Sequence, residues 1–457
     1  MSQVIEQFVV SVQELSAQGK FQELSNVLAA SQILDPDEVP LSALEMALET
    51  LNPYRHTIGV LYILSAKHVL SVNADFTEVF RQSKDIILAA DPEQLPYALD
   101  QFVNLCHRFT AALVERHCAM RGIHLMQVAI TKIQRAASQL TPLHADLCQL
   151  CLVAKCFKPA LRILDIDITD VLKYEGQNVK SCLLYFYYGG MIYTALKKFE
   201  RALFFFEAAV TVDAVVVSHI VLEAYRKRIL VSLIAQGKVD PLPTWTAPVV
   251  ERFARQLSKP YHDLEVAYSS SSVAQVRELC LKNSDRFARD GNMGLVKHCV
   301  SALTRKNIKK LTKTFLTLSL ADVAQRCELS GSKEAEQQLF NMIEDGEIFA
   351  AINQKDGMVV FMDNPNKFNN TNCFLDLEQM MHRYMEINEK VRQLSEEIAL
   401  DPKYLIKSAA HDEDIAGPSA SSGFSRSGTV GSSSSSSKIP MNLRGSSNSP
   451  GARSSAS

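Results

Sequence analysis

The sequence lacks the short motifs of the common catalytic and nucleotide-binding sites. It contains no GxxxxGK phosphate loop, no GxGxxG turn, no GxSxG elbow and no HExxH pair, and it has no His-x-His anywhere. No segment approaches the roughly 18 consecutive apolar residues of a membrane-spanning helix. The N-terminus shows no basic region followed by a continuous apolar core, so we expect no signal peptide. We therefore expect no catalytic residues, no bound metal, no cofactor and no membrane association.

Neither sign of charge dominates the composition. The 457 residues include 48 basic and 50 acidic side chains, and this balance gives no indication of a nucleic-acid or membrane partner. Ten cysteines are scattered along expected helices, which favours reduced thiols in the cytosol or nucleus over a disulfide framework. The length predicts two to four domains.

Residues 1–230 read almost entirely as amphipathic helices, and part of this region repeats. AKCFKPALRIL begins at residue 154 and aligns with LKKFERALFFF, which begins at residue 196, so the period is 196 − 154 = 42 residues. The second copy has the spacing of a tetratricopeptide repeat, with small residues where paired helices approach. The residues that carry this spacing are Phe186, Gly190, Tyr193, Ala202, Phe206 and Ala209. We expect a helical-repeat solenoid over residues 1–230.

One cluster within the repeats could be taken for a metal site. His144, Cys148 and Cys151 are spaced so that all three could face one ion from a single helix. The repeat alignment instead places Cys148 and Cys151 at the helix-packing positions of Gly190 and Tyr193. Because a buried free cysteine behaves as a small apolar side chain, we assign both thiols to the core.

Residues 307–365 are the only part of the chain where helices give way to strands in a regular order. The expected elements are a helix, a strand (314–318), a helix that Ser319 caps, a helix ending at Gly346 and a hairpin of 348–352 with 358–361. This order predicts a winged helix. Residues 231–306 are expected to continue the helices into it.

The third helix of this winged helix is acidic. Lys333 is accompanied there by four carboxylates, Glu334, Glu336, Glu344 and Asp345, and Glu347 follows just beyond the helix. Phosphate contacts supply most of the affinity of a DNA-binding helix, and these carboxylates would repel them. We expect no direct nucleic-acid binding.

The segments TKTFLTLSL, MIEDGEIFA and INQKDGMV closely resemble the winged-helix half of the PCI domain, which proteasome-lid, signalosome and initiation-factor subunits share. The resemblance implies a module that assembles protein complexes, with winged helices associating edge to edge. Phe315, Leu316 and Leu318 lie in the first of these segments, and we expect them at a protein interface.

A heptad pattern follows within residues 372–407. Seven apolar residues step alternately by three and four: Leu377, Met380, Tyr384, Ile387, Val391, Leu394 and Ile398. This pattern predicts a seam that enters a helical bundle with partner subunits. The alternative is a helix folded back onto its own domain. Residues 408–457 are rich in serine and poor in large apolar residues, so we expect disorder.

HADLCQLCLVAKCFKPAL, YYGGMIYTALKKFERAL and NMGLVKHC are similar to the third-subunit branch of the COP-nine signalosome. The resemblance implies a non-catalytic scaffold, in cytoplasm and nucleus, of the complex that removes the ubiquitin-like modifier Nedd from cullins and so regulates cullin-RING ubiquitin ligases. A different subunit, with a His-x-His zinc site, would supply the chemistry. The alternatives are a proteasome-lid or initiation-factor subunit and, from another class, a winged-helix nucleic-acid binder.

Overall fold

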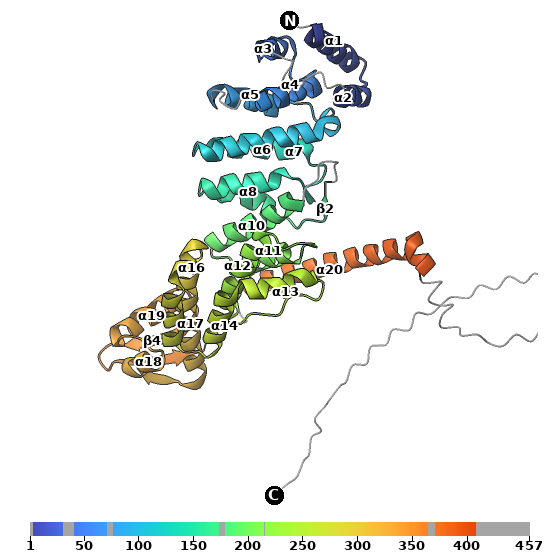
Figure 1. Cartoon of the computed structure of the whole chain (residues 1–457). Coiled ribbons are helices and arrows are strands. Elements are labelled where there is room, and N and C mark those ends of the chain that lie inside the picture. The colour runs from blue at the N-terminus through green and yellow to red at the C-terminus, as the bar shows by residue number, and fades with distance from the viewer. Residues whose placement is uncertain are drawn as a thin grey trace, which may run out of the picture. The chain divides into compact units, whose positions relative to one another are not determined.

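The computed structural model describes residues 3–30, 41–70, 76–172, 179–213, 215–363 and 371–407 (Figure 1). The chain divides into two compact units, residues 1–363 and 364–457. The Ser-rich segment 408–457, for which the sequence predicts disorder, lies outside the described residues. None of the described helices has the length and apolar character needed to cross a membrane.

The first unit begins with a stack of antiparallel helices (Figure 1). Helices α4, α6, α8, α10 and α12 follow one another through the stack, each packing on the next. The bounds are α1 Gln3–Ala17, α2 Phe21–Ala30, α3 Leu41–Thr50, α4 Thr57–Leu70, α5 Phe76–Ala89, η1 Leu95–Ala98, α6 Leu99–Glu115, α7 Met120–Ile133, α8 Leu143–Val153, α9 Lys158–Leu164, α10 Val179–Ala195, α11 Phe199–Thr211 and α12 His219–Ala235. Two short strands, β1 (Gln139–Leu140) and β2 (Asp170–Val171), pair in parallel. The predicted mostly helical repeat fold is confirmed.

The same tight turn recurs between paired helices. Lys155 and Lys197, which are 42 residues apart, both adopt positive φ angles of 53° and 60°, and His117 does so one repeat earlier at 54°. In each turn the next backbone N–H donates to a carbonyl five residues back, as from Lys198 to Tyr193 at 2.9 Å. This is the Schellman cap that usually uses glycine. Tertiary packing thus holds non-glycine residues in a left-handed conformation.

Helices α10 and α11 pack closely through two glycines of α10. A Cβ atom added at Gly190 would lie 2.7 Å from the ring of Phe206, and one at Gly189 would lie 2.6 Å from the ring of Phe205. Ala202 on α11 is fully buried in the same core. The predicted use of small residues at this helix pair is confirmed.

The second half of the first unit carries five more helices and the winged helix. The helices are α13 Pro248–Leu257, α14 Lys259–Ser269, α15 Val273–Lys282, α16 Ser284–Arg289 and α17 Met293–Thr314. The winged helix adds β3 Thr317–Ser319, α18 Leu320–Arg326, α19 Ser332–Glu344, β4 Phe349–Asn353 and β5 Met358–Met362. The three strands form an antiparallel sheet in the order β3-β5-β4.

Local sequence signals explain most of the winged helix. The Ser319 hydroxyl accepts a hydrogen bond from the Asp322 backbone N–H at 3.1 Å and caps α18. Gly346 and Gly357 take the positive φ angles expected after α19 and in the hairpin turn. The predicted strand start at Thr314 is wrong, because the Thr314 hydroxyl donates to the Lys310 carbonyl and keeps this residue in α17.

The second unit contains one long helix, α20 (Thr371–Leu400), followed by a short helical segment over 402–407. Every residue of α20 whose exposure is described is exposed. The predicted seam residues are 46% to 67% exposed. Apolar side chains in this unit therefore face solvent.

We predict that Gly190→Ala lowers the free energy of unfolding by about 1–3 kcal/mol, because the new methyl group overlaps the Phe206 ring. Gly294→Ala in α17 is the matched control, since no atom lies within 4 Å of its added Cβ. That change should be neutral or stabilise by up to about 1 kcal/mol through helix propensity. Thermal and urea unfolding measure both. Equal effects of the two substitutions would contradict the packing explanation.

Candidate protein-interaction surfaces

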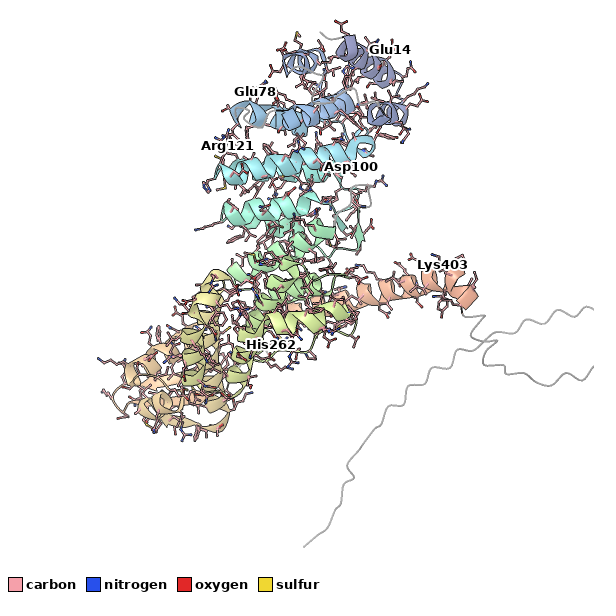
Figure 2. All side chains as sticks on the ribbon, in the orientation of Figure 1. Glu14, Glu78, Asp100, Arg121, His262 and Lys403 are labelled. Atoms are coloured by element: carbon pink, nitrogen blue, oxygen red, sulfur yellow. The ribbon has the colours of Figure 1, made fainter. Side chains whose placement is uncertain are left out.

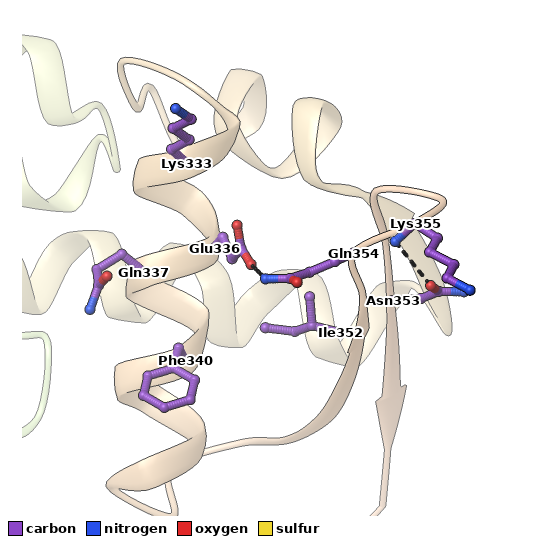
Figure 3. A pocket seen from close by; sticks show the side chains of 8 residues that line it. All are labelled: Lys333, Glu336, Gln337, Phe340, Ile352, Asn353, Gln354 and Lys355. Carbon is purple, nitrogen blue, oxygen red and sulfur yellow. Dashed lines mark hydrogen bonds between the residues drawn. The ribbon is translucent and has the colours of Figure 1, made fainter.

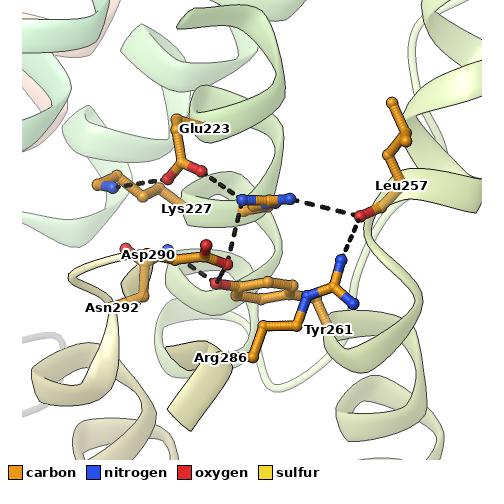
Figure 4. A network of polar contacts seen from close by, with 8 residues as sticks. Glu223, Lys227, Leu257, Tyr261, Arg286, Asp290 and Asn292 are labelled. Carbon is orange, nitrogen blue, oxygen red and sulfur yellow. Dashed lines mark hydrogen bonds and ion pairs between the residues drawn. The ribbon is translucent and has the colours of Figure 1, made fainter. Parts of the chain in front are cut away.

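A buried polar network joins the repeats to the helices that precede the winged helix (Figure 4). Arg226 on α12 pairs with Glu223 at 2.5 Å and with Asp290, after α16, at 3.1 Å. Tyr261 on α14 donates to Asp290 at 2.8 Å and accepts from the Asn292 amide at 2.9 Å. Arg226 also donates to the carbonyl oxygen at the end of α13. The network thus ties α12 to α13, to α14 and to the turn before α17.

The basic residues of α17 are used within the first unit. Arg305 pairs with Asp345 at 2.8 Å and with Glu347 at 2.9 Å, just beyond α19. Lys309 also pairs with Glu347, and the Lys306 ammonium donates to the Gly237 carbonyl at 2.6 Å. These three cations thus connect α17 to the winged helix and to the end of α12.

Glu328 makes a second connection between the winged helix and the preceding helices. Its carboxylate accepts from the Ser272 hydroxyl at 3.1 Å and from the Ala274 backbone N–H at 2.6 Å. Both groups lie at the N-terminus of α15, where a carboxylate is favourable. Glu328 itself has a φ angle of 53°. The strained backbone at Glu328 therefore positions a carboxylate that caps the N-terminus of α15.

The cysteine cluster of the repeats lies in the core, as the sequence predicts. Cys148 and Cys151 are fully buried, and burial raises the pKa of Cys151 to about 12. Burial also lowers the pKa of His144 to about 4, and its Nδ1 atom accepts from the Thr141 N–H at 3.1 Å. Near neutral pH both thiols therefore keep their protons and the His144 imidazole is uncharged, which suits all three side chains to core packing. No group of three or more His, Cys, Asp or Glu side chains in the described ranges is arranged to hold a metal.

The expected winged-helix interface residues lie in three different environments. Leu316 is 80% exposed. Phe315 is partly buried, with the Arg326 guanidinium 4.6 Å above its ring. Leu318 is only 7% exposed, because strand alternation points it into the core of the winged helix. Its side chain leaves little surface for a partner, so an interface at β3 would use Leu316.

The outer face of the sheet is apolar, which the sequence reasoning missed. Phe349 on β4 lies opposite Met362 on β5, and Ala351 lies opposite Val360. Phe349, Val360 and Met362 are 40% to 54% exposed. A solvated sheet face normally alternates polar residues with buried ones. The strands FAAIN and MVVFM lack this alternation, and that signal could have predicted a covered face.

Comparison with known proteins assigns the family. The N-terminal helical repeats of COP9 signalosome complex subunit 3 match residues 18–250, and the PCI domain matches residues 276–363. A Drosophila melanogaster protein named COP9 signalosome complex subunit 3 is 42% identical over 432 residues, covering 91% of this chain and 96% of that protein. The protein of that name from Dictyostelium discoideum is 34% identical over 391 residues, covering 85% and 92%. The chain belongs to the COP9 signalosome complex subunit 3 family.

The PCI domain match covers helices that precede the winged helix as well as the winged helix itself. The PCI match begins at residue 276, so it includes α17 and most of α15 in addition to the winged helix. Helix α17 carries the contacts of Arg305 and Lys309, and Ser272, the partner of Glu328, lies just before α15 and outside the match. The family match confirms the predicted resemblance and disfavours the proteasome-lid and initiation-factor alternatives.

We predict that stability falls in acid through His144. Its folded pKa of about 4 lies below the ordinary histidine pKa of 6.5, so the neutral imidazole stabilises the fold above pH 6.5. That contribution is lost as pH falls towards 4, by ~3 kcal/mol at about 1.4 kcal/mol per unit. His144→Asn keeps an acceptor for Thr141 without the titration. The stability difference between the two proteins should therefore narrow from pH 7.5 to pH 4.5 in urea unfolding. A constant difference would contradict the assignment.

Proposed function

We propose that the chain is a non-catalytic scaffold subunit of a COP9 signalosome, located in cytoplasm and nucleus. The complex removes Nedd from cullins and so regulates cullin-RING ubiquitin ligases, while another subunit supplies the zinc chemistry. The observation that carries this proposal is the exposed apolar seam of α20. The family assignment supports it.

The seam needs a partner for energetic reasons. Leu377, Ile387, Val391 and the other seam residues remain 46% to 67% exposed on a helix of 30 residues. Complete burial of seven such side chains would contribute up to about 10–20 kcal/mol before entropy is subtracted. Ordering the backbone of a helix of 30 residues costs on the order of 30–60 kcal/mol, which the helix's own hydrogen bonds offset only in part. We infer that α20 becomes firmly ordered in a helical bundle with other subunits.

The winged helix supplies a second surface of the scaffold. Leu316 stands beside the edge strand β3, and Phe349, Val360 and Met362 form the apolar outer face of the sheet. An exposed apolar patch of this kind is typical of a protein–protein contact. We propose that neighbouring subunits cover it through their own winged helices. The cullin-RING ligases are then indirect partners.

We predict that Ile387→Asp with Val391→Asp weakens retention of the chain in the assembled complex. Two carboxylates in a dry seam cost several kcal/mol each, roughly 2–7 kcal/mol for an unpaired polar group. The matched control is Gln379→Asp with Gln393→Asp, which adds the same charge to α20 outside the seam. Co-purification followed by gel filtration measures the retained fraction. Undiminished retention of the seam variant would show that α20 does not hold the subunit.

We also predict that the purified chain carries no stoichiometric zinc and does not cleave Nedd from a cullin conjugate. Metal analysis and a cleavage assay on the isolated chain measure both. About one zinc per chain that disappears in Cys148→Ala would overturn the packing role of that thiol. Cleavage by the isolated chain would overturn the scaffold assignment.

A further inference from the structure

A groove opens between α19 and β4 on the winged helix (Figure 3). Its volume is about 940 Å³. Phe340 and Ile352 form its apolar part, Lys333 and Lys355 stand at its rim, and Glu336 and Gln354 lie between them. This volume is near the upper end for ligand-binding clefts, so it suits several side chains of a peptide segment better than a single small ion.

The apolar part of the groove is left open within the first unit. Phe340 is 57% exposed although it lies on the same helix as the fully buried Leu339. Helical spacing places it one turn beyond Glu336 on the outward stripe of α19, away from the core-facing stripe. Ile352 is only partly buried against the winged-helix core. A bulky apolar side chain can therefore enter between the phenyl ring and Ile352.

The charges of the groove favour an acidic occupant. Glu336 accepts a hydrogen bond from the Gln354 amide, which crosses the groove from the hairpin. Lys333 and Lys355 are exposed, and no carboxylate among the described residues pairs with either ammonium. Among the residues that line the groove, two ammonium groups, one from α19 and one from the hairpin turn, thus face a single carboxylate that is already engaged. Complementary charge at the rim of an interface selects the partner and speeds association.

The geometry points to a docking site for a short linear segment of another signalosome subunit. That segment carries one large apolar residue for the gap between Phe340 and Ile352, flanked by Asp or Glu residues for Lys333 and Lys355. The inference rests on the proposed function, because it takes the partner to be another subunit of the same complex. The α19–β4 groove is made of other residues than the sheet's outer face and the α20 seam.

The test uses the full chain and an array of overlapping 20-residue peptides that covers the other signalosome subunits. We expect bound peptides to share an apolar residue beside acidic ones. Binding of those peptides, measured by fluorescence polarisation, should weaken at least tenfold with Phe340→Asp. It should also weaken with the double change Lys333→Glu and Lys355→Glu, and recover partly when a peptide's acidic residues are replaced by lysine. Leu281→Asp on α15, a site 76% exposed outside the groove, is the control and should bind like the unchanged chain.

The inference is overturned if no peptide binds or if Phe340→Asp binds as well as the control variant. Binding of a duplex DNA oligonucleotide that Lys333→Glu abolishes would also overturn it in favour of nucleic acid. Incorporation into the assembled complex separates this inference from the proposed function. A chain that enters the complex but binds no peptide refutes only the groove, whereas a chain that never enters the complex refutes the scaffold assignment.

Discussion

The structure of the first unit depends on the burial of four charged side chains on helix α12. Glu223, Arg226, Lys227 and Arg228 are each less than 10% exposed. Isolated buried charges are costly, and here each has a partner: Glu223 accepts from both Arg226 and Lys227, and Arg228 donates to the carbonyl of Asp240. Removing one partner from such a pair typically costs about 3–5 kcal/mol. The network therefore favours a single arrangement of these elements, because Arg226 is fully paired only when Asp290 and α14 are in contact with α12.

The contacts of α17 extend this constraint to the winged helix. Arg305 and Lys309 hold the acidic end of α19, and Lys306 returns to the turn after α12. Glu328 caps α15 from the other side. The acidic character of α19, which argues against DNA binding, thus has a structural use. With its inner side engaged in this way, the winged helix leaves the sheet's outer face and the α19–β4 groove available to partners.

The sequence predicts the local features of this chain better than its long-range ones. The 42-residue period, Gly190, the Ser319 cap and Gly357 each report a geometry that neighbouring residues decide. The charges of α12 could not be predicted as buried, because a helix that contains EAYRKR looks like a surface helix until distant partners such as Asp290, which is 290 − 226 = 64 residues from Arg226, are known. Likewise, Leu316 and Leu318 look alike in the sequence, but Leu318 lies within β3 and is buried, whereas Leu316 precedes the strand and is exposed. The seam of α20 was predicted from its heptads, and its exposure agrees with a role outside its own unit.

The central claim is that α20 and the winged helix hold this subunit in its assembly. Lysine-directed cross-linking of the purified complex, followed by mass spectrometry, tests it most directly. The account predicts that Lys403 (Figure 2) and Lys390 of the second unit, together with Lys333 and Lys355 of the winged helix, carry most cross-links to other subunits. Cross-links to other subunits that come only from the helical repeats, with none from these four lysines, would contradict it.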